Sequence, residues 1–117
     1  MEILTADKLD DIIHSLKFID SEAKKIKDPL LTRYLMYVHV LGRLETRAFT
    51  ENNFKDIHKL FYNRYYWFVQ FKERYFALYG HDEGLEQQSF KMINEYNEKL
   101  PEEIDWATIE QIENHSI

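Results

Sequence analysis

Histidine is the residue type in this sequence best suited to proton transfer or metal binding, and the chain contains five. Two of them stand near a carboxylate, as Asp11-x-x-His14 and Asp56-x-His58, but helical spacing places His14 on an exposed face. The sequence has no His-Glu-x-x-His motif, no paired Glu-x-x-His motif of the di-iron bundles and no cysteine. We therefore expect ordinary surface histidines and no metal site.

Nucleotide-binding loops and activated serines need glycine patterns that this chain lacks. With three glycines in all, it contains neither Gly-x-Gly-x-x-Gly nor a phosphate-binding P-loop. It also has no Gly-x-Ser-x-Gly motif of the kind that exposes a nucleophilic serine. We expect no cofactor and no enzymatic activity of these kinds.

Arg33 and His39 are the remaining pair of residues that could act together in catalysis. The arginine would hold a scissile phosphate and the histidine would transfer a proton. The Arg33-x5-His39 spacing resembles the Arg-His motif of HEPN-type ribonucleases, which are also small helical domains. The resemblance covers these two residues only, Tyr34 replaces the polar residue usual after that arginine, and a continuous helix separates the two side chains by about 120°. Ribonuclease activity is the lesser alternative that this resemblance implies.

Residues 61–79 carry the most unusual feature, because ten of these nineteen residues are aromatic. At 100° per residue, most of the rings share one broad face, which we expect to be core. Tyr62 and Tyr66 fall on one flank and Trp67 on the other. The aromatic arc of roughly 260° is wider than the apolar stripe that a surface helix needs. Either the helix is central, with neighbours on most sides, or these three rings face a partner.

We expect the second arrangement, with exposed aromatic side chains at a protein interface. Tyrosine and tryptophan are enriched at interfaces because they bury a large area at little cost in side-chain entropy. The predicted partner-binding residues are Tyr62, Tyr66, Trp67, Lys59 and Arg74.

Charged residues also fall on helix faces where the pattern predicts apolar ones. These are Asp20, Glu45, Arg64 and Lys72. Burying an unpaired charge is costly, so we expect the four residues to pair with one another at helix edges or to form a polar network inside the bundle. Our specific hypothesis is an ion pair between Glu45 and Arg64.

The distribution of charge bears on nucleic acids as partners. Residues 24–74 hold eleven basic and five acidic residues, whereas residues 82–117 hold two basic and ten acidic ones. A nucleic-acid-binding protein would gather its cations on one exposed face, here Lys55, Lys59, Arg64, Lys72 and Arg74. Since these residues are spread around two helices, nucleic-acid binding is an alternative and not the favoured function. The acidic third is a solvated face or docks onto something basic.

These residues must be positioned by helices, since the scarcity of glycine and proline favours few, long elements. Apolar periodicity predicts an all-α fold of four to five antiparallel helices, with one long central helix at about residues 51–79. The predicted segments are Ala6–Lys27, Pro29–Arg47, Thr50–Gly80, Glu83–Lys99 and a short helix after Asp105. Gly42 costs helix propensity, which suggests close approach of another backbone.

The third segment, if unbroken, would be roughly 44 Å long at ~1.5 Å per residue. A compact domain of this chain length is only about 35 Å across. We therefore expect the helix to kink, to protrude or to pack along a second copy, and we predict a homodimer.

Composition sets the remaining bounds. The 117 residues predict a single domain over 1–117, and 44% hydrophobic residues can supply a core. No run of about 18 apolar residues and no secretory signal is present, so we expect no membrane partner. The absence of cysteine fits a reducing compartment, and we expect a cytoplasmic protein. The favoured function is a non-enzymatic protein-binding module that regulates, inhibits or assembles a partner, or itself.

Overall fold

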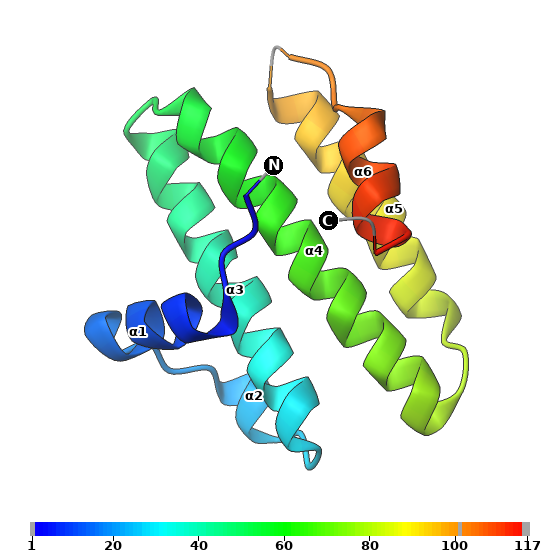
Figure 1. Ribbon diagram of the computed structural model, residues 1–117. Coiled ribbons are helices and arrows are strands. Elements are labelled where there is room, and N and C mark those ends of the chain that lie inside the picture. The colour runs from blue at the N-terminus through cyan, green and yellow to red at the C-terminus, as the bar shows by residue number, and fades with distance from the viewer. Residues whose placement is uncertain (1, 101, 116–117) are drawn as a thin grey trace.

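The computed structural model describes residues 2–100 and 102–115, and these residues form only helices and connecting segments (Figure 1). The helices are α1 Ala6–Leu16, α2 Ser21–Lys24, α3 Pro29–Thr50, α4 Phe54–Tyr79, α5 Glu83–Lys99 and α6 Trp106–Glu113. The all-α class and the long central helix are therefore confirmed.

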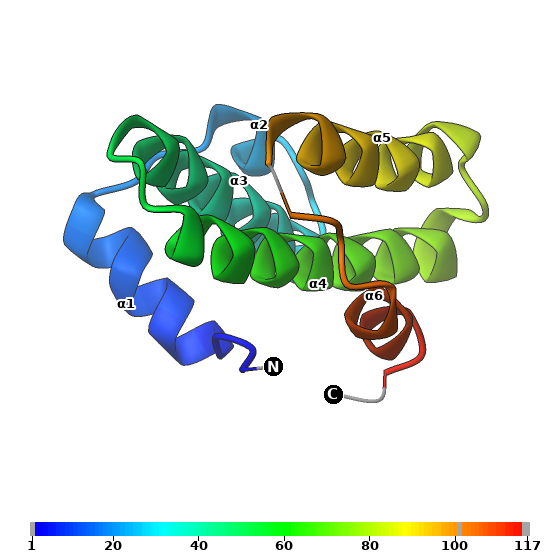
Figure 2. The same ribbon diagram turned by 90° about the horizontal axis from the view of Figure 1, so that it is seen from above.

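The helices form three layers around an antiparallel pair, α3 and α4, which share the most extensive contact in the described part of the chain. Figure 2 shows α2 and α5 on one side of this pair and α1 and α6 on the other. Helix α4 therefore has α3 beside it, α5 on one face and α6 on the opposite face. Helix α1 departs from the predicted antiparallel arrangement, because it crosses α3 steeply (Figure 1).

Helix ends follow the capping residues that the sequence supplies. Asp28 accepts a hydrogen bond from the amide of Leu31, and Pro29 starts α3 at a position where no backbone donor is needed. Asp105 caps α6 in the same way. Gly80, at φ 87°, ends α4 with a conformation that only glycine adopts at low cost.

The first predicted helix, Ala6–Lys27, is wrong in its extent. The chain leaves α1 at Lys17, whose φ of 51° is left-handed, and a short α2 begins after Asp20. Asp20 is not on the inner stripe of a long helix. Its carboxylate accepts hydrogen bonds from the amides of Glu22 and Ala23 at the start of α2, so a local cap overrides the continuous apolar period.

The central helix also begins later than predicted. Helix α3 continues through Thr50, Asn52 turns the chain with a positive φ, and Asn53 caps α4. Helix α4 is continuous over 26 residues, which corresponds to about 39 Å. The molecule measures 38 × 31 × 23 Å. Because α4 is continuous and its length matches the longest extent of the molecule, the helix fits without a break. Its length therefore no longer argues for a dimer.

The core surrounds α4 and includes buried apolar side chains from each of the described helices α1 to α6. Leu41, Phe61, Tyr65, Met92 and Ile112 are among its most deeply buried members. In the part of the chain that the structure describes, no helix is long and apolar enough to cross a membrane.

Candidate functional site

Trp67 is covered by the N-terminal segment and by α3, which contradicts the predicted exposure. Only 8% of its surface is exposed. Its indole Nε1 donates a hydrogen bond to the carbonyl of Leu4 at 3.2 Å, and its ring packs edge-on against Tyr37 with 4.9 Å between centroids. The non-helical segment before α1 covers this flank of α4, and helical periodicity carries no information about such a segment.

Tyr62 is likewise covered by the segment that joins α5 to α6. It is 9% exposed, and its hydroxyl accepts a hydrogen bond from the amide of Asp105 at 2.8 Å. Tyr66 is half-buried and packs edge-on against Trp67, and burial raises the pKa of its phenol. The expected exposed aromatic face is thus wrong, and the alternative of a central helix is right.

Asn63, which the sequence analysis did not single out, fixes the N-terminal segment together with Trp67. Its amide oxygen accepts a hydrogen bond from the Leu4 amide at 2.6 Å, and its amide nitrogen donates to the carbonyls of Glu2 and Lys59. The side chain is completely buried. The sequence did contain one sign of this contact. Asn63 is a polar residue one helical turn before Trp67, on a flank of α4 whose apolar surface another segment had to cover, and a buried polar side chain needs hydrogen-bond partners.

The predicted ion pair between Glu45 and Arg64 is present. Arg64 Nε and Nη2 lie 2.6 and 3.3 Å from the two carboxylate oxygens of Glu45. The side chains are only 18% and 13% exposed. The pair joins α3 to α4, and Arg64 also lies over the ring of Phe61.

The other two members of the predicted network have separate partners. Lys72 reaches α5, where it lies 3.3 Å from Glu86 and donates to the hydroxyl of Ser89. Asp20 lies 2.5 Å from His39 Nδ1. Asp20, Glu45, Arg64 and Lys72 therefore act in three helix-joining contacts and not in one internal polar site.

Arg33 and His39 are not brought together. Arg33 donates to Asp10 at 2.6 Å, which joins α3 to α1. It also donates to the hydroxyl of Tyr37 within α3. His39 faces Asp20 beside α2, which lies on the opposite side of α3. The geometry therefore provides no shared cleft for ribonuclease chemistry.

The cations that a nucleic-acid-binding face would require are largely neutralised within the chain. Arg64 and Lys72 pair with Glu45 and Glu86. Arg74 pairs with Asp28 at 2.8 Å, and this guanidinium lowers the pKa of the Asp28 carboxyl. Arg74, predicted as a partner-binding residue, is thus committed to holding the start of α3.

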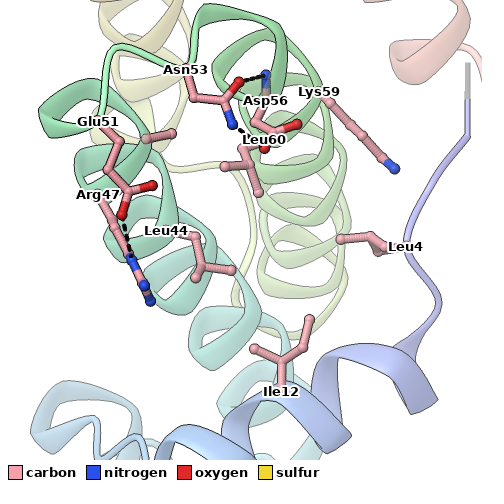
Figure 3. Close-up of a pocket in the computed structure, with 10 residues that line it drawn as sticks. Leu4, Ile12, Leu44, Arg47, Glu51, Asn53, Asp56, Lys59 and Leu60 are labelled. Atoms are coloured by element: carbon pink, nitrogen blue, oxygen red, sulfur yellow. Dashed lines mark hydrogen bonds and ion pairs between the residues drawn. The ribbon is translucent and has the colours of Figure 1, made fainter.

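Of the five predicted partner-binding residues, Tyr62 lines a depression near the start of α4, and Lys59 lines a groove elsewhere on the surface. This groove, of about 360 Å³, lies between the N-terminal segment, α1, α3 and α4. Figure 3 shows Leu4, Ile12, Leu44 and Leu60 directed into it from these four parts of the chain.

Charged side chains form the rim of the groove. On the α3 side, Arg47 pairs with Glu51 at 3.2 Å. On the α4 side, Asp56 accepts a hydrogen bond from the Asn53 side chain, and Lys59 extends from the next turn (Figure 3). An apolar floor with a charged rim is typical of a surface that binds a ligand or another protein.

The apolar side of α1 and the paired charges of the rim determine the chemistry of the groove. Helix α1 is strongly amphipathic in sequence, yet only Leu9 is buried among its apolar residues, and Leu16 is exposed. Arg47 and Asp56 on the rim pair with Glu51 and Asn53, which are close to them in sequence. Among the described residues, no group of three or more histidine or acidic side chains could hold a metal ion. The floor of the groove offers apolar contact through Leu4, Ile12, Leu44 and Leu60.

Comparison with protein-family models, with curated proteins and with solved structures gives no match to this chain.

Proposed function

We propose that this protein is a non-enzymatic protein-binding module, and that its binding surface is the groove between α1, α3 and α4. The single observation that carries the proposal is an apolar floor built from four separate parts of the chain and left open to solvent. Trp67 of α4 contributes by holding the N-terminal segment that forms one wall of this groove, and not by contacting the partner.

The proposed occupant of the groove is an apolar segment of another protein. By binding that segment, this protein would regulate, inhibit or assemble its partner. A volume of about 360 Å³ lies at the small end of the range for ligand sites. Side chains of leucine size would contact Leu44 and Leu60, and the charges of both signs on the rim would favour a segment with polar residues on its outer side.

The test is a comparison of affinity capture by three proteins. Leu44→Glu/Leu60→Glu places two charges on the floor of the groove, whereas Leu78→Glu changes an exposed leucine near the end of α4, outside the groove. We expect the wild type and Leu78→Glu to retain the same partner, and the groove variant to lose it.

Both variants are first checked by thermal unfolding, and the partner is then purified and its dissociation constant measured. At least a tenfold weakening is expected for the groove variant, since two buried apolar contacts are replaced by charges. Equal affinity of the partner for all three proteins would overturn the proposed site.

Self-association remains part of the proposal as an alternative occupant, with a second copy filling the groove. Light scattering at high micromolar concentration measures this, and a dimer that dissociates in Leu44→Glu/Leu60→Glu would identify the copy as the partner. We further propose a reducing, cytoplasmic setting, which is supported only by the absence of cysteine.

A further inference from the structure

A second hollow region is lined by residues of the start of α4, the end of α5 and the start of α6. Figure 1 shows that these ends of the helices lie at one end of the molecule. The region consists of two depressions of about 450 and 400 Å³, and both are lined by Glu102 and Glu103. We call this region the acidic end. It shares no lining residue with the groove between α1, α3 and α4.

The charge of the acidic end is negative. Three carboxylates, from Glu102, Glu103 and Asp105, line the depressions against one lysine, Lys55. Glu102 lies 3.2 Å from His58 Nε2. The Asp105 carboxylate accepts hydrogen bonds from the amides of Ala107 and Thr108 at the start of α6. No lysine or arginine occurs in residues 100–117.

Exposed aromatic rings at the same place are an independent feature. Trp106 borders one depression and is 58% exposed, and Phe54 borders the other and is 43% exposed. Tryptophan is among the more strongly buried residue types on average. A ring face next to carboxylates is the arrangement that attracts ammonium and guanidinium groups, because the ring quadrupole and the negative charge act on the same cation.

We infer that the acidic end is a second binding surface, and that it takes a segment of another protein rich in arginine or lysine. A nucleic acid is disfavoured there, because its phosphates would meet three carboxylates. Two adjacent depressions can receive two side chains of one segment, and the paired carboxylates between them provide the charge complementarity that steers a basic partner.

The experiment uses a fluorescein-labelled, arginine-rich nonapeptide, with a peptide of the same length in which citrulline replaces every arginine. Citrulline keeps the shape of the side chain and removes its charge. Fluorescence anisotropy is measured at low salt, of about 50 mM, and again at about 0.5 M. We expect saturable binding of the arginine peptide only, weakened at high salt, with a shift of the Trp106 indole resonance in the NMR spectrum.

Matched variants separate a site from general charge attraction. Glu102→Gln/Glu103→Gln removes two charges at the acidic end, and Asp7→Asn/Asp11→Asn removes two exposed charges on α1. We expect about tenfold weaker binding for the first and less than about twofold for the second. Trp106→Ala is expected to weaken binding by about threefold to tenfold.

Several outcomes would overturn the inference. These are equal losses in the two charge variants, equal binding of the citrulline peptide, or no binding by the wild type. Leu44→Glu/Leu60→Glu should bind the arginine peptide as the wild type does. Failure at the acidic end can therefore be distinguished from failure of the proposed groove.

Discussion

Asn63 shows how a single side chain can position a segment that has no secondary structure of its own. Its buried amide supplies hydrogen bonds to the backbone of Glu2 and Leu4, and Trp67 supplies another one turn later. The N-terminal segment in turn forms one wall of the groove through Leu4. Packing of the segment and shape of the groove therefore depend on the same residue.

We expect Asn63→Ala to lower the free energy of unfolding by about 1–3 kcal/mol, because it leaves buried backbone groups without partners. Urea titration measures this change. Fluorescence should also shift to the red, since Trp67 loses part of its cover. Asn94→Ala, at an exposed position on α5, should change stability by less than about 0.5 kcal/mol. A similar loss of unfolding free energy in both variants would show that the hydrogen bonds of Asn63 make no specific contribution to stability.

The ion pair between Glu45 and Arg64 gives a second prediction at this scale. Glu45→Gln should cost about 1–3 kcal/mol, because the mostly buried Arg64 loses its bidentate partner. Glu45→Met/Arg64→Met should cost less than the sum of the two single changes.

The control for this pair is Glu51→Gln, which breaks the exposed Arg47–Glu51 pair on α3 and should cost less than about 0.5 kcal/mol. Unfolding in urea gives the free energy change for Glu45→Gln, Glu51→Gln, Glu45→Met, Arg64→Met and the double methionine variant. Additive losses in the double methionine variant would show that the pair makes no coupled contribution.

At the scale of the element, Gly42 and Gly80 differ in why glycine is present. We expected Gly42 to admit another backbone, and the structure instead places the Arg64 side chain there, with Cδ 3.6 Å from where a Cβ would be. That distance is an ordinary contact. Gly80, by contrast, ends α4 with a positive φ that other residues adopt only with strain.

Gly42→Ala should therefore stabilise the protein by about 0.5–1 kcal/mol, through helix propensity within α3. Gly80→Ala should destabilise it by about 1–3 kcal/mol. The melting temperatures of the two variants should move in opposite directions. A lower melting temperature for Gly42→Ala would mean that the Arg64 side chain cannot accommodate the added methyl group.

At the scale of the whole molecule, buried tyrosines link stability to alkaline pH. Burial and a hydrogen bond to Asp10 raise the pKa of Tyr37 to about 12. Burial also raises the pKa of Tyr65 and of Tyr96. The folded state thus keeps these phenols neutral at pH values where the unfolded chain ionises them. Their contribution is present in full below the ordinary pKa of about 10 and is lost as the pH rises through the folded value.

We therefore expect the urea midpoint to fall steadily between about pH 10 and 12. Absorbance at 295 nm should show phenolate forming together with unfolding. Tyr37→Phe removes one of the linked groups, so its midpoint should fall less steeply with pH, although it starts lower through loss of the bonds to Asp10 and Arg33. Identical slopes for the two proteins would contradict the assignment to Tyr37.

The sequence by itself determined the helical class, the start of α3 at Asp28–Pro29, the end of α4 at Gly80 and the pairing of Glu45 with Arg64. These features depend on local capping, on the period of apolar residues and on the cost of an unpaired charge, all of which can be evaluated along one chain. The break after α1 was missed because the cap formed by Asp20 competes with an apolar pattern that continues past it.

Only the tertiary structure decided where the rings of α4 lie. Tyr62 and Trp67 are covered by an N-terminal segment and by a connection between helices, and both covers are held by hydrogen bonds to backbone groups. Such bonds require no particular side chain in the covering segment, so the sequence carries almost no signal for them. The groove arises for the same reason, since its floor joins residues from four parts of the chain that only folding brings together.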